Sequence, residues 1–286
     1  MTPIYSSYRG RLAPTPSGLL HAGHARTFLA VWRRVREESG TLVFRVEDID
    51  RERCRPEFEV AAREDLAWLG IDWDEGGGRE GDFGPYRQSD RGELHRQVWL
   101  QLIRDGWVYP ADFSRKEILR HQPRRESDGG ILFPDALREA HESGQTAEPN
   151  PAINWRFRVP DGEIIEFEDG EKGRQRYVAG KDFGDFLVWR KAGGPSYELA
   201  VVADDIAMKI TEVVRGEDLL LSTARQLLLY RALGAVAPGF RHVPLVRDRA
   251  GVRLSKTARS VAIRELRDEG WSPAQILAWP DRGDQS

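Results

Sequence analysis

The sequence predicts an α/β fold in which a parallel sheet covered by helices is interrupted by an inserted α+β segment. Short apolar strands and amphipathic helices alternate along the first third of the chain, as is typical of parallel sheets. The pattern changes to short β-like runs near Tyr109 and changes back near residue 195. The 286 residues are 40% hydrophobic and 31% charged, a balance that supports a globular protein with a sizeable core.

Each element expected in the first part of the chain has a local reason. A strand over Arg9–Ala13 leads into the loop Pro14–Gly18, and apolar residues then recur at helical spacing over His21–Glu38. Gly40 ends this helix, and Thr41–Val46 is rich in β-branched and aromatic residues, as buried strands are. The elements expected next are a helix at Pro56–Leu69, a strand at Ile71–Trp73, a glycine-rich loop at Gly76–Gly84 and a helix at Arg91–Asp105.

The inserted segment, residues 110–194, begins with a basic stretch that we expect to be helical, Ser114–Arg125, and contains a linker at Pro149–Ala152. Its expected strands are Asn154–Val159, Ile164–Glu168, Gln175–Ala179 and Phe186–Lys191. The alternating pattern returns with Ser196–Ala203, a strand at Ile210–Val214, a helix at Thr223–Leu233, a strand at Val243–Val246, a basic loop at Arg247–Arg259 and one or two closing helices. The expected domains are therefore the first half of the sheet domain (1–109), the insertion (110–194), the second half (195–257) and a short helical end (258–286).

Composition excludes several classes of protein. The single cysteine, Cys54, rules out an internal disulfide framework and a zinc site built from cysteines. No apolar stretch is long enough to cross a bilayer, and Met1–Gly10 lacks a signal-peptide pattern. A net charge of −3 means that a nucleic-acid partner would be held by local basic patches. We therefore expect a cytoplasmic, monomeric enzyme.

The first chemistry-bearing segment is the loop and helix start that contain His21, Gly23 and His24. The start of a helix exposes unpaired N–H groups and partial positive charge, which suit a phosphate. A glycine in the first turn allows close approach of a nucleotide, and two imidazoles one turn apart can donate hydrogen bonds to phosphate oxygens. Taken alone, the two histidines also fit an ordinary helix start.

A second segment, Gly251–Thr257, follows a predicted strand and carries Lys256. A lysine on a loop supplies a mobile ammonium for a polyphosphate. Taken alone, however, the segment is better explained as a solvated basic loop. In a parallel sheet the first and second segments can meet at the carboxyl edge, where ligands bind.

Charged residues also follow two other predicted strands. Glu47 lies at the end of an apolar strand, where a carboxylate can bind an ammonium group, and Arg215 follows another strand, where a guanidinium can bind a carboxylate bidentately. A polar strand end beside a turn is the structural alternative for Glu47. For Asp204 and Asp205 we favour a structural role in a helix cap or loop network.

Taken together, these segments resemble the class I aminoacyl-tRNA synthetases. The residues from His21 to His24 resemble the first signature of that family, and Arg253–Thr257 resembles the second, with arginine in place of the usual leading lysine. Four further segments resemble the glutamyl branch: those starting at Arg11, Arg45, Asp185 and Val213. The similarity runs in order from about Arg9 to Lys256.

The resemblance implies a Rossmann-like nucleotide-binding catalytic domain that uses ATP and Mg²⁺ to activate L-glutamate as glutamyl-adenylate. His21, Gly23, His24 and Lys256 would be catalytic. The implied ATP-binding residues are His21, Gly23, His24, Arg253, Ser255 and Lys256. The implied glutamate-binding residues are Arg11, Ala13, Thr15, Glu47, Tyr197 and Arg215.

Because little chain follows the second signature, we expect no anticodon-binding domain. In this respect the chain resembles the truncated glutamyl-Q tRNA(Asp) synthetases. In that group glutamate is transferred to queuosine at the wobble position, so the implied partner is the anticodon loop of tRNA(Asp). The alternatives are a truncated glutamyl-tRNA synthetase that charges a tRNA 3′ end, a catalytically inactive synthetase-like RNA-binding protein, and an adenylyl-transferring enzyme that makes a small glutamyl product. Basic residues that could follow RNA, or simply form solvated faces, are Arg115–Arg125, Arg247, Arg249, Arg253, Arg259, Arg264 and Arg267.

Many members of the truncated group bind zinc through cysteines near Tyr109–Arg115. Here Ala111 and Phe113 stand at two of those positions. We therefore predict an insertion without zinc that is packed through Phe113 and its neighbours, and we expect no metal ligands among the site residues.

Overall fold

The computed structural model describes residues 7–138, 148–245 and 261–278. The chain forms two compact units. The first comprises Met1–Asp90, Lys209–Glu217 and Pro238–Ser286, and the second comprises Arg91–Met208 and Asp218–Ala237. The second unit thus contains the whole of segment 110–194, together with helical segments on both sides of it.

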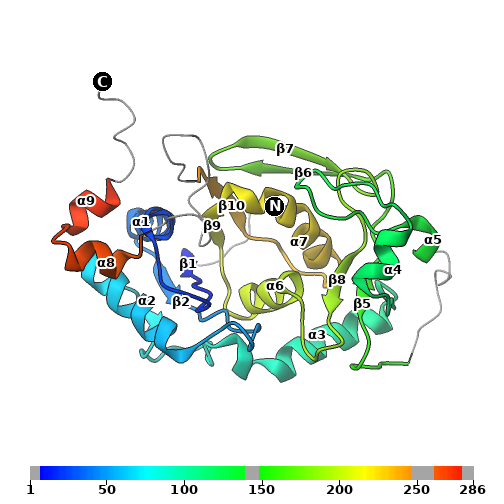
Figure 1. Cartoon of the computed structure of the whole chain (residues 1–286), viewed down its shortest axis with the longest axis horizontal. Coiled ribbons are helices and arrows are strands. Elements are labelled where there is room, and N and C mark those ends of the chain that lie inside the picture. Colours follow the sequence, from blue (N-terminus) through cyan, green and yellow to red (C-terminus); the bar gives the residue numbers. More distant parts are fainter. Residues whose placement is uncertain (1–6, 139–147, 246–260, 279–286) are drawn as a thin grey trace. The chain divides into compact units, whose positions relative to one another are not determined.

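The first unit is built on parallel strands (Figure 1). They are β1 (Arg9–Leu12), β2 (Thr41–Phe44) and β3 (Glu75–Gly76), in the order β1-β2-β3, and the pair β9 (Glu212–Gly216) and β10 (Gly239–Val243). Strand β9 lies beside β1, because the Thr211 N–H donates to the Arg9 carbonyl at 2.9 Å. With β2 on one side and β9 on the other, β1 lies at a topological switch point. Ligands of open α/β sheets bind outside the carboxyl ends of the strands at such a point.

The helices of the first unit pack around β1 and β2 (Figure 1). They are α1 (Ala22–Glu37), α2 (Pro56–Trp68), α8 (Ile263–Asp268) and α9 (Pro273–Leu277). Buried residues of α1 such as Ala25, Phe28 and Val35 follow helical spacing and face the core. The helix ends because Ser39 adopts a left-handed φ of 51° and Gly40 packs on Tyr8, where a Cβ would lie 2.6 Å from the Tyr8 carbonyl oxygen.

The second unit combines helices with a three-stranded antiparallel sheet and an antiparallel hairpin. Its strands are β4 (Val108–Pro110), β5 (Trp155–Phe157) and β8 (Phe186–Trp189) in the order β4-β5-β8, and the hairpin β6 (Ile164–Asp169) and β7 (Gly173–Val178). Its helices are α3 (Gly92–Arg104), α4 (Arg115–Arg120), α5 (Asp135–Arg138), α6 (Tyr197–Ala207) and α7 (Leu220–Ala232). The Trp99 and Trp189 rings stack at 4.5 Å between centroids, with Trp155 edge-on to Trp99, so the core of this unit is aromatic.

Most of the predicted elements are confirmed, and three expectations are wrong in position or extent. Ile71–Trp73 is not a strand: the Ile71 N–H bonds back to the Leu66 carbonyl and closes α2, and pairing with β2 begins at Glu75. Ile71 and Trp73 are apolar because they are buried in the core.

The last predicted strand, Val243–Val246, overlaps β10 only at Val243. The strand begins earlier, at Gly239, where the polar residues Arg241 and His242 hide the alternation in the sequence. The basic helix expected over Ser114–Arg125 ends at Arg120, because Gln122 has a φ of 45° and precedes a proline.

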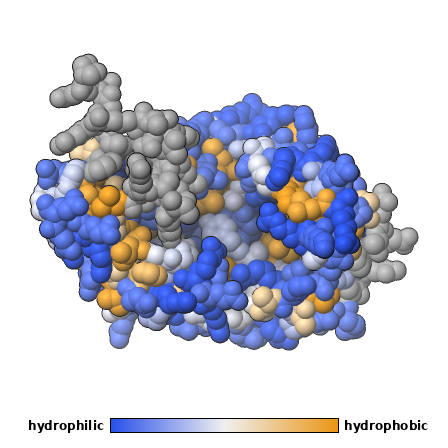
Figure 2. Space-filling view, viewed as in Figure 1, coloured by the Kyte–Doolittle hydropathy of each residue, from blue (hydrophilic) through white to orange (hydrophobic). Residues whose placement is uncertain are grey.

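A few large apolar residues are exposed on the described surface. Those most exposed are Val60, Leu119, Ile164, Val236 and Val261. On the face drawn in Figure 2, hydrophobic residues form separate small groups within a mainly hydrophilic surface. None of the helices in the described ranges has the length and hydrophobicity required to span a membrane.

Candidate active site

The loops that follow β1 and β2 are held together by backbone hydrogen bonds. The Arg45 N–H donates to the Leu12 carbonyl at 2.8 Å, and the Glu47 N–H donates to the Pro14 carbonyl at 3.0 Å. Glu47 therefore lies beside the segment that contains Ala13 and Thr15. Three of the residues predicted to bind glutamate are thus brought together by the pairing of two strands.

Glu47 is part of a buried ion pair. Its Oε1 accepts a hydrogen bond from Nη2 of Arg45 at 2.9 Å, and the side chains are 8% and 0% exposed, respectively. A charge-assisted hydrogen bond of this kind offsets part of the cost of burying the carboxylate.

Two buried arginines come from the neighbouring strands β1 and β9. Nη1 of Arg11 donates to the Val214 carbonyl at 3.2 Å, which links Arg11 to the residue before Arg215. Nε of Arg215 lies 3.0 Å from Nε2 of His242 on β10. Arg11 is 4% exposed and Arg215 is 5% exposed. Both guanidinium groups are therefore held close to the carboxyl edge of the sheet.

His242 is a residue that the sequence reasoning missed. It is fully buried and lies directly opposite Arg215 in the parallel register of β9 and β10. In the sequence it is a lone histidine outside any motif, within a strand that was predicted in the wrong place. Only the pairing of the strands reveals its partner.

His21 and His24 form the start of α1. Nδ1 of His21 accepts from the Gly23 N–H at 3.2 Å, and Nδ1 of His24 accepts from the His21 N–H at 3.2 Å. An Nδ1 that accepts places the proton of a neutral imidazole on Nε2. The two rings, 3.7 Å apart between centroids, therefore each present an Nε2–H donor. The two histidines can therefore form an ordinary helix start and also bind a phosphate. In each ring Nδ1 accepts a backbone hydrogen bond at the helix start, and Nε2 is a donor.

The segment after the second signature returns to His21. Ala262 forms an antiparallel bridge with His21, and the Ile263 N–H donates to the Leu20 carbonyl at 2.8 Å. Arg253, Ser255 and Lys256, which the sequence analysis assigned to ATP, lie outside the described residues.

Tyr197 is the first residue of α6 in the second unit, where it is half-buried. Ser196 caps this helix by accepting from the Leu199 N–H at 3.3 Å. Arg11, Ala13, Thr15, Glu47 and Arg215 lie in the first unit. The structure therefore assigns these five residues to one unit and Tyr197 to the other.

The structural interpretation of Asp204 is confirmed. Its Oδ1 accepts from Nε of the buried Arg91 at 2.6 Å and lies 3.0 Å from Nε2 of the buried His95. The aspartate lies inside α6, not at a helix cap or in a loop, so its network joins α3 to α6.

Apolar packing takes up Ala111 and Phe113, the two positions at which the resemblance implied cysteines. Ala111 is buried in a cluster with Tyr109, Ile118 and Phe133, and Phe113 packs against it with its ring 6.2 Å from that of Phe133. The predicted packing through Phe113 is therefore confirmed. Among the described residues, no group of three or more His, Cys, Asp or Glu side chains could hold a metal ion.

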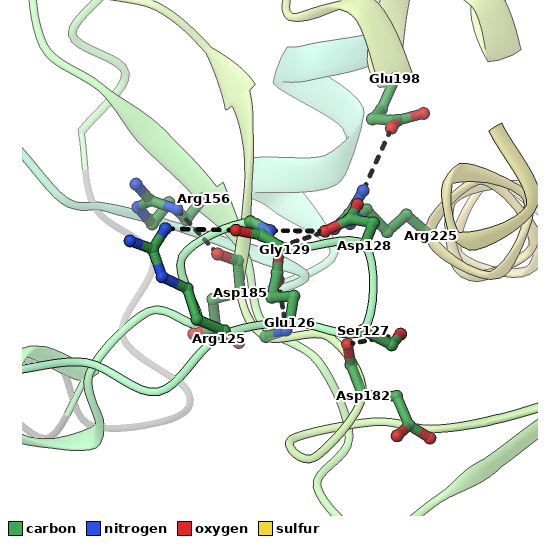
Figure 3. A network of polar contacts seen from close by, with 12 residues as sticks. Arg125, Glu126, Ser127, Asp128, Gly129, Arg156, Asp182, Asp185, Glu198 and Arg225 are labelled. Atoms are coloured by element: carbon green, nitrogen blue, oxygen red, sulfur yellow. Dashed lines mark hydrogen bonds and ion pairs between the residues drawn. The ribbon is translucent and has the colours of Figure 1, made fainter. Parts of the chain in front are cut away.

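A polar network fixes the loop of the second unit that contains Glu126 and Asp128 (Figure 3). Nη2 of Arg225 lies 2.7 Å from Oε2 of Glu126 and 3.3 Å from Asp128, and Nη1 lies 3.9 Å from Glu198. The Gly184 N–H donates to Glu126 at 2.8 Å. These bonds attach the loop to α6, to α7 and to the segment before β8.

Comparison with known proteins identifies the family. The sequence matches the family described as "tRNA synthetases class I (E and Q), catalytic domain" over residues 7–282. It is 43% identical to a glutamyl-Q tRNA(Asp) synthetase from Symbiobacterium thermophilum over 94% of this chain and 84% of that protein. It is 42% identical to one from Nitratidesulfovibrio vulgaris over 95% of this chain and 84% of that protein.

Longer relatives and solved structures belong to the same family. A glutamate–tRNA ligase 2 from Syntrophus aciditrophicus is 39% identical over 94% of this chain, which spans 56% of the ligase. The crystal structure of a glutamate tRNA ligase from Elizabethkingia meningosepticum in complex with its amino acid has a TM-score of 0.77 and 29% identity, covering 93% of this chain and 53% of its own. A glutamate–tRNA synthetase from Elizabethkingia anophelis has a TM-score of 0.81 and 27% identity, covering 97% of this chain and 63% of its own.

The resemblance and the fold class inferred from the sequence are thus confirmed. The chain belongs to the class I tRNA synthetases of the glutamate and glutamine branch, a family of ligases, and it is similar to the glutamyl-Q tRNA(Asp) synthetases within that branch.

Proposed function

We propose that this protein activates L-glutamate with ATP to give glutamyl-adenylate and transfers the glutamate to queuosine at the wobble position of tRNA(Asp). One observation carries the activation step: a buried carboxylate and two buried guanidinium groups lie at the ends of three adjacent parallel strands. That arrangement suits a small zwitterion that carries an additional carboxylate. The names of the two glutamyl-Q relatives support the acceptor.

The glutamate would be held by charge at both ends. Glu47 would accept from the α-ammonium, and Arg215 would bind the side-chain carboxylate, while Arg11, Ala13, Thr15 and Tyr197 would line the pocket. A guanidinium selects glutamate over glutamine because an amide leaves part of a buried cation without its anionic partner, a costly mismatch.

Activation is a displacement at the α-phosphorus of ATP. An oxygen of the glutamate α-carboxylate forms a bond to this phosphorus, and the bond from the phosphorus to the bridging oxygen of pyrophosphate breaks. The Nε2–H donors of His21 and His24 would stabilise the charge that builds on the phosphate oxygens, and Gly23 would leave room for the nucleotide. Mg²⁺, when bound to the triphosphate oxygens, neutralises charge on the leaving group.

Lys256, with Arg253 and Ser255, would bind the departing pyrophosphate. Lys256 precedes Ala262 by six residues, and Ala262 pairs with His21. Lys256 is thus close in sequence to a segment that pairs with the start of α1, which supports its assignment to the same triphosphate.

In the second step a hydroxyl of the RNA attacks the acyl carbon of the adenylate, and AMP leaves. The acceptor would be the anticodon loop of tRNA(Asp), whose bases can splay out from the stack and be read individually. Exposed basic residues of the second unit, among them Arg115 and Lys116 on α4, would contribute phosphate contacts.

The second candidate is transfer to the 3′ end of a tRNA. It is favoured by relatives named glutamate–tRNA ligase at 38% and 39% identity. A third candidate, an RNA-binding protein without catalysis, is disfavoured because the first signature, Arg215 and Lys256 are all present.

The deciding experiment is glutamate-dependent ATP–pyrophosphate exchange with and without tRNA, followed by nuclease mapping of radiolabelled glutamate on the RNA. We expect exchange, and label in the anticodon fragment. Label on the terminal adenosine would establish the second candidate instead, and failure of exchange with every tRNA tested would overturn the proposed activation step.

A further inference from the structure

The side chain that supports Arg215 comes from the neighbouring strand. His242 is opposite Arg215 in the register of β9 and β10, and its Nε2 lies 3.0 Å from Nε of Arg215. Arginine has no acceptor, so the imidazole nitrogen must accept the hydrogen bond. The proton of His242 is therefore on Nδ1, and the ring is neutral when it makes this contact.

A second residue of β10 contacts the same guanidinium. Phe240 lies two positions before His242 on the same face of the strand, and its ring centroid is 5.6 Å from Cζ of Arg215. The Phe240 and His242 rings are nearly parallel, with an interplanar angle of 15°. Strand β10 thus contacts Arg215 through one aromatic face and one hydrogen-bond acceptor.

This contact fixes the orientation of the guanidinium. A guanidinium binds a carboxylate bidentately either through Nε and one Nη or through both Nη groups. Because Nε donates to His242, the first edge is already occupied. The hydrogen bond from Nε therefore fixes the plane and the direction of the Arg215 guanidinium.

We propose that His242 is a positioning residue that sets the specificity of the site for glutamate by orienting Arg215 through Nε. This inference rests on the proposed function, in which Arg215 binds the side-chain carboxylate. His242 does not contact the substrate in this scheme, so it acts on glutamate binding and on the discrimination between glutamate and glutamine. It leaves the chemistry at the α-phosphate unchanged.

The test compares two amide substitutions that differ in reach. In His242→Gln the amide oxygen can take the position of the imidazole Nε2, whereas in His242→Asn the shorter side chain cannot reach Nε of Arg215. Each variant is assayed by ATP–pyrophosphate exchange for kcat, for KM with L-glutamate and with ATP, and for exchange with L-glutamine. Thermal unfolding of each variant reports its folding.

We expect His242→Asn to raise KM for glutamate about tenfold, the effect of losing one hydrogen bond to a charged group. Its kcat and its KM for ATP should stay within about twofold of wild type, and the preference for glutamate over glutamine should fall. His242→Gln should restore KM for glutamate to within about threefold of wild type.

The matched control is His95, which is equally buried and also bonds a charged side chain, Asp204, but lies in the second unit. His95→Asn should lower the unfolding temperature and leave KM for glutamate unchanged.

Equal values of KM for glutamate in wild type and in both His242 variants would overturn the inference. So would a fall in kcat for both variants with unchanged KM, which indicates a structural role only. Absence of glutamate-dependent exchange in the wild-type protein would instead overturn the proposed function, so the two failures are distinguishable. If His242→Asn does not fold, His242→Leu replaces it, with the same expected rise in KM.

Discussion

Arg215 is the single residue on which the choice of amino acid depends. Arg215 is 5% exposed, and its Nε donates to His242, which holds the guanidinium in one orientation. We expect Arg215→Ala to lower kcat/KM for glutamate by about 100-fold or more, because the substrate carboxylate loses its buried partner. The measurement is ATP–pyrophosphate exchange at varied glutamate concentration, with circular dichroism to establish that the variant is folded.

The control for this prediction is Arg241→Ala, which removes an arginine from the adjacent position on β10, where side chains alternate between faces. Its effect on kcat/KM for glutamate should be less than about threefold. Wild-type exchange by a folded Arg215→Ala protein would refute the assigned role of Arg215.

Asp65 is a second residue with a specific consequence, this time for stability. It is fully buried on α2, and its nearest cation is Arg264 of α8 at 4.0 Å. Burial raises the pKa of the Asp65 carboxyl to about 6, more than the attraction of Arg264 lowers it. A carboxyl whose pKa is higher in the folded state binds protons more tightly there, so its ionisation destabilises the fold as pH rises from about 4 to 6.

We therefore expect Asp65→Asn to raise the free energy of unfolding at pH 8 by on the order of 1 kcal/mol, and to have little effect near pH 4. Urea denaturation at the two pH values measures the difference. The control is Glu64→Gln, a neighbouring carboxylate at 57% side-chain exposure that also pairs with Arg264. A gain from Asp65→Asn that is equal at both pH values would contradict this account.

At the scale of elements, the sequence predicted strands and helices wherever apolar spacing and glycine ends agreed. The α1 helix and the strand before it match the expected ranges closely, because Phe28, Val31 and Val35 repeat at helical spacing and Gly40 follows. The β10 strand was predicted several residues late, because its inward residues are Phe240 and His242 and a polar residue is not expected in a buried strand.

The residues of the candidate site were likewise predicted only where a local motif marks them. Motif residues such as Arg11 and Glu47 were predicted, and strand pairing brings their loops together. The roles of His242 and Arg45 were not predicted. His242 contacts Arg215 across two strands, and Arg45 pairs with the buried Glu47, and no motif in the sequence marks either contact.

We expect apolar packing, without zinc, to hold the insertion together. Phe133 is 2% exposed at the centre of the apolar cluster that contains Ala111. We expect Phe133→Ala to lower the free energy of unfolding by about 3 kcal/mol. We expect the zinc chelator 1,10-phenanthroline to leave the unfolding temperature of the wild-type protein unchanged. Chemical denaturation and thermal scans measure the two effects. A fall in unfolding temperature with chelator that added zinc reverses would show that metal holds the fold.

At the scale of the whole molecule, the mechanism requires residues from the two ends of the chain to act on one triphosphate. His24 lies on α1, and Lys256 precedes the segment that pairs with His21. We expect His24→Ala and Lys256→Ala each to lower kcat for ATP–pyrophosphate exchange by about 100-fold, as for the loss of one donor to a developing anion. The effects of groups that act as a unit are not additive. The factor by which kcat falls in the double variant should therefore be at least about tenfold smaller than the product of the two single factors. The control pair is His24→Ala with Arg241→Ala, for which the losses should multiply. Losses that multiply for His24 and Lys256 as well would mean that the two signatures act on separate ligands.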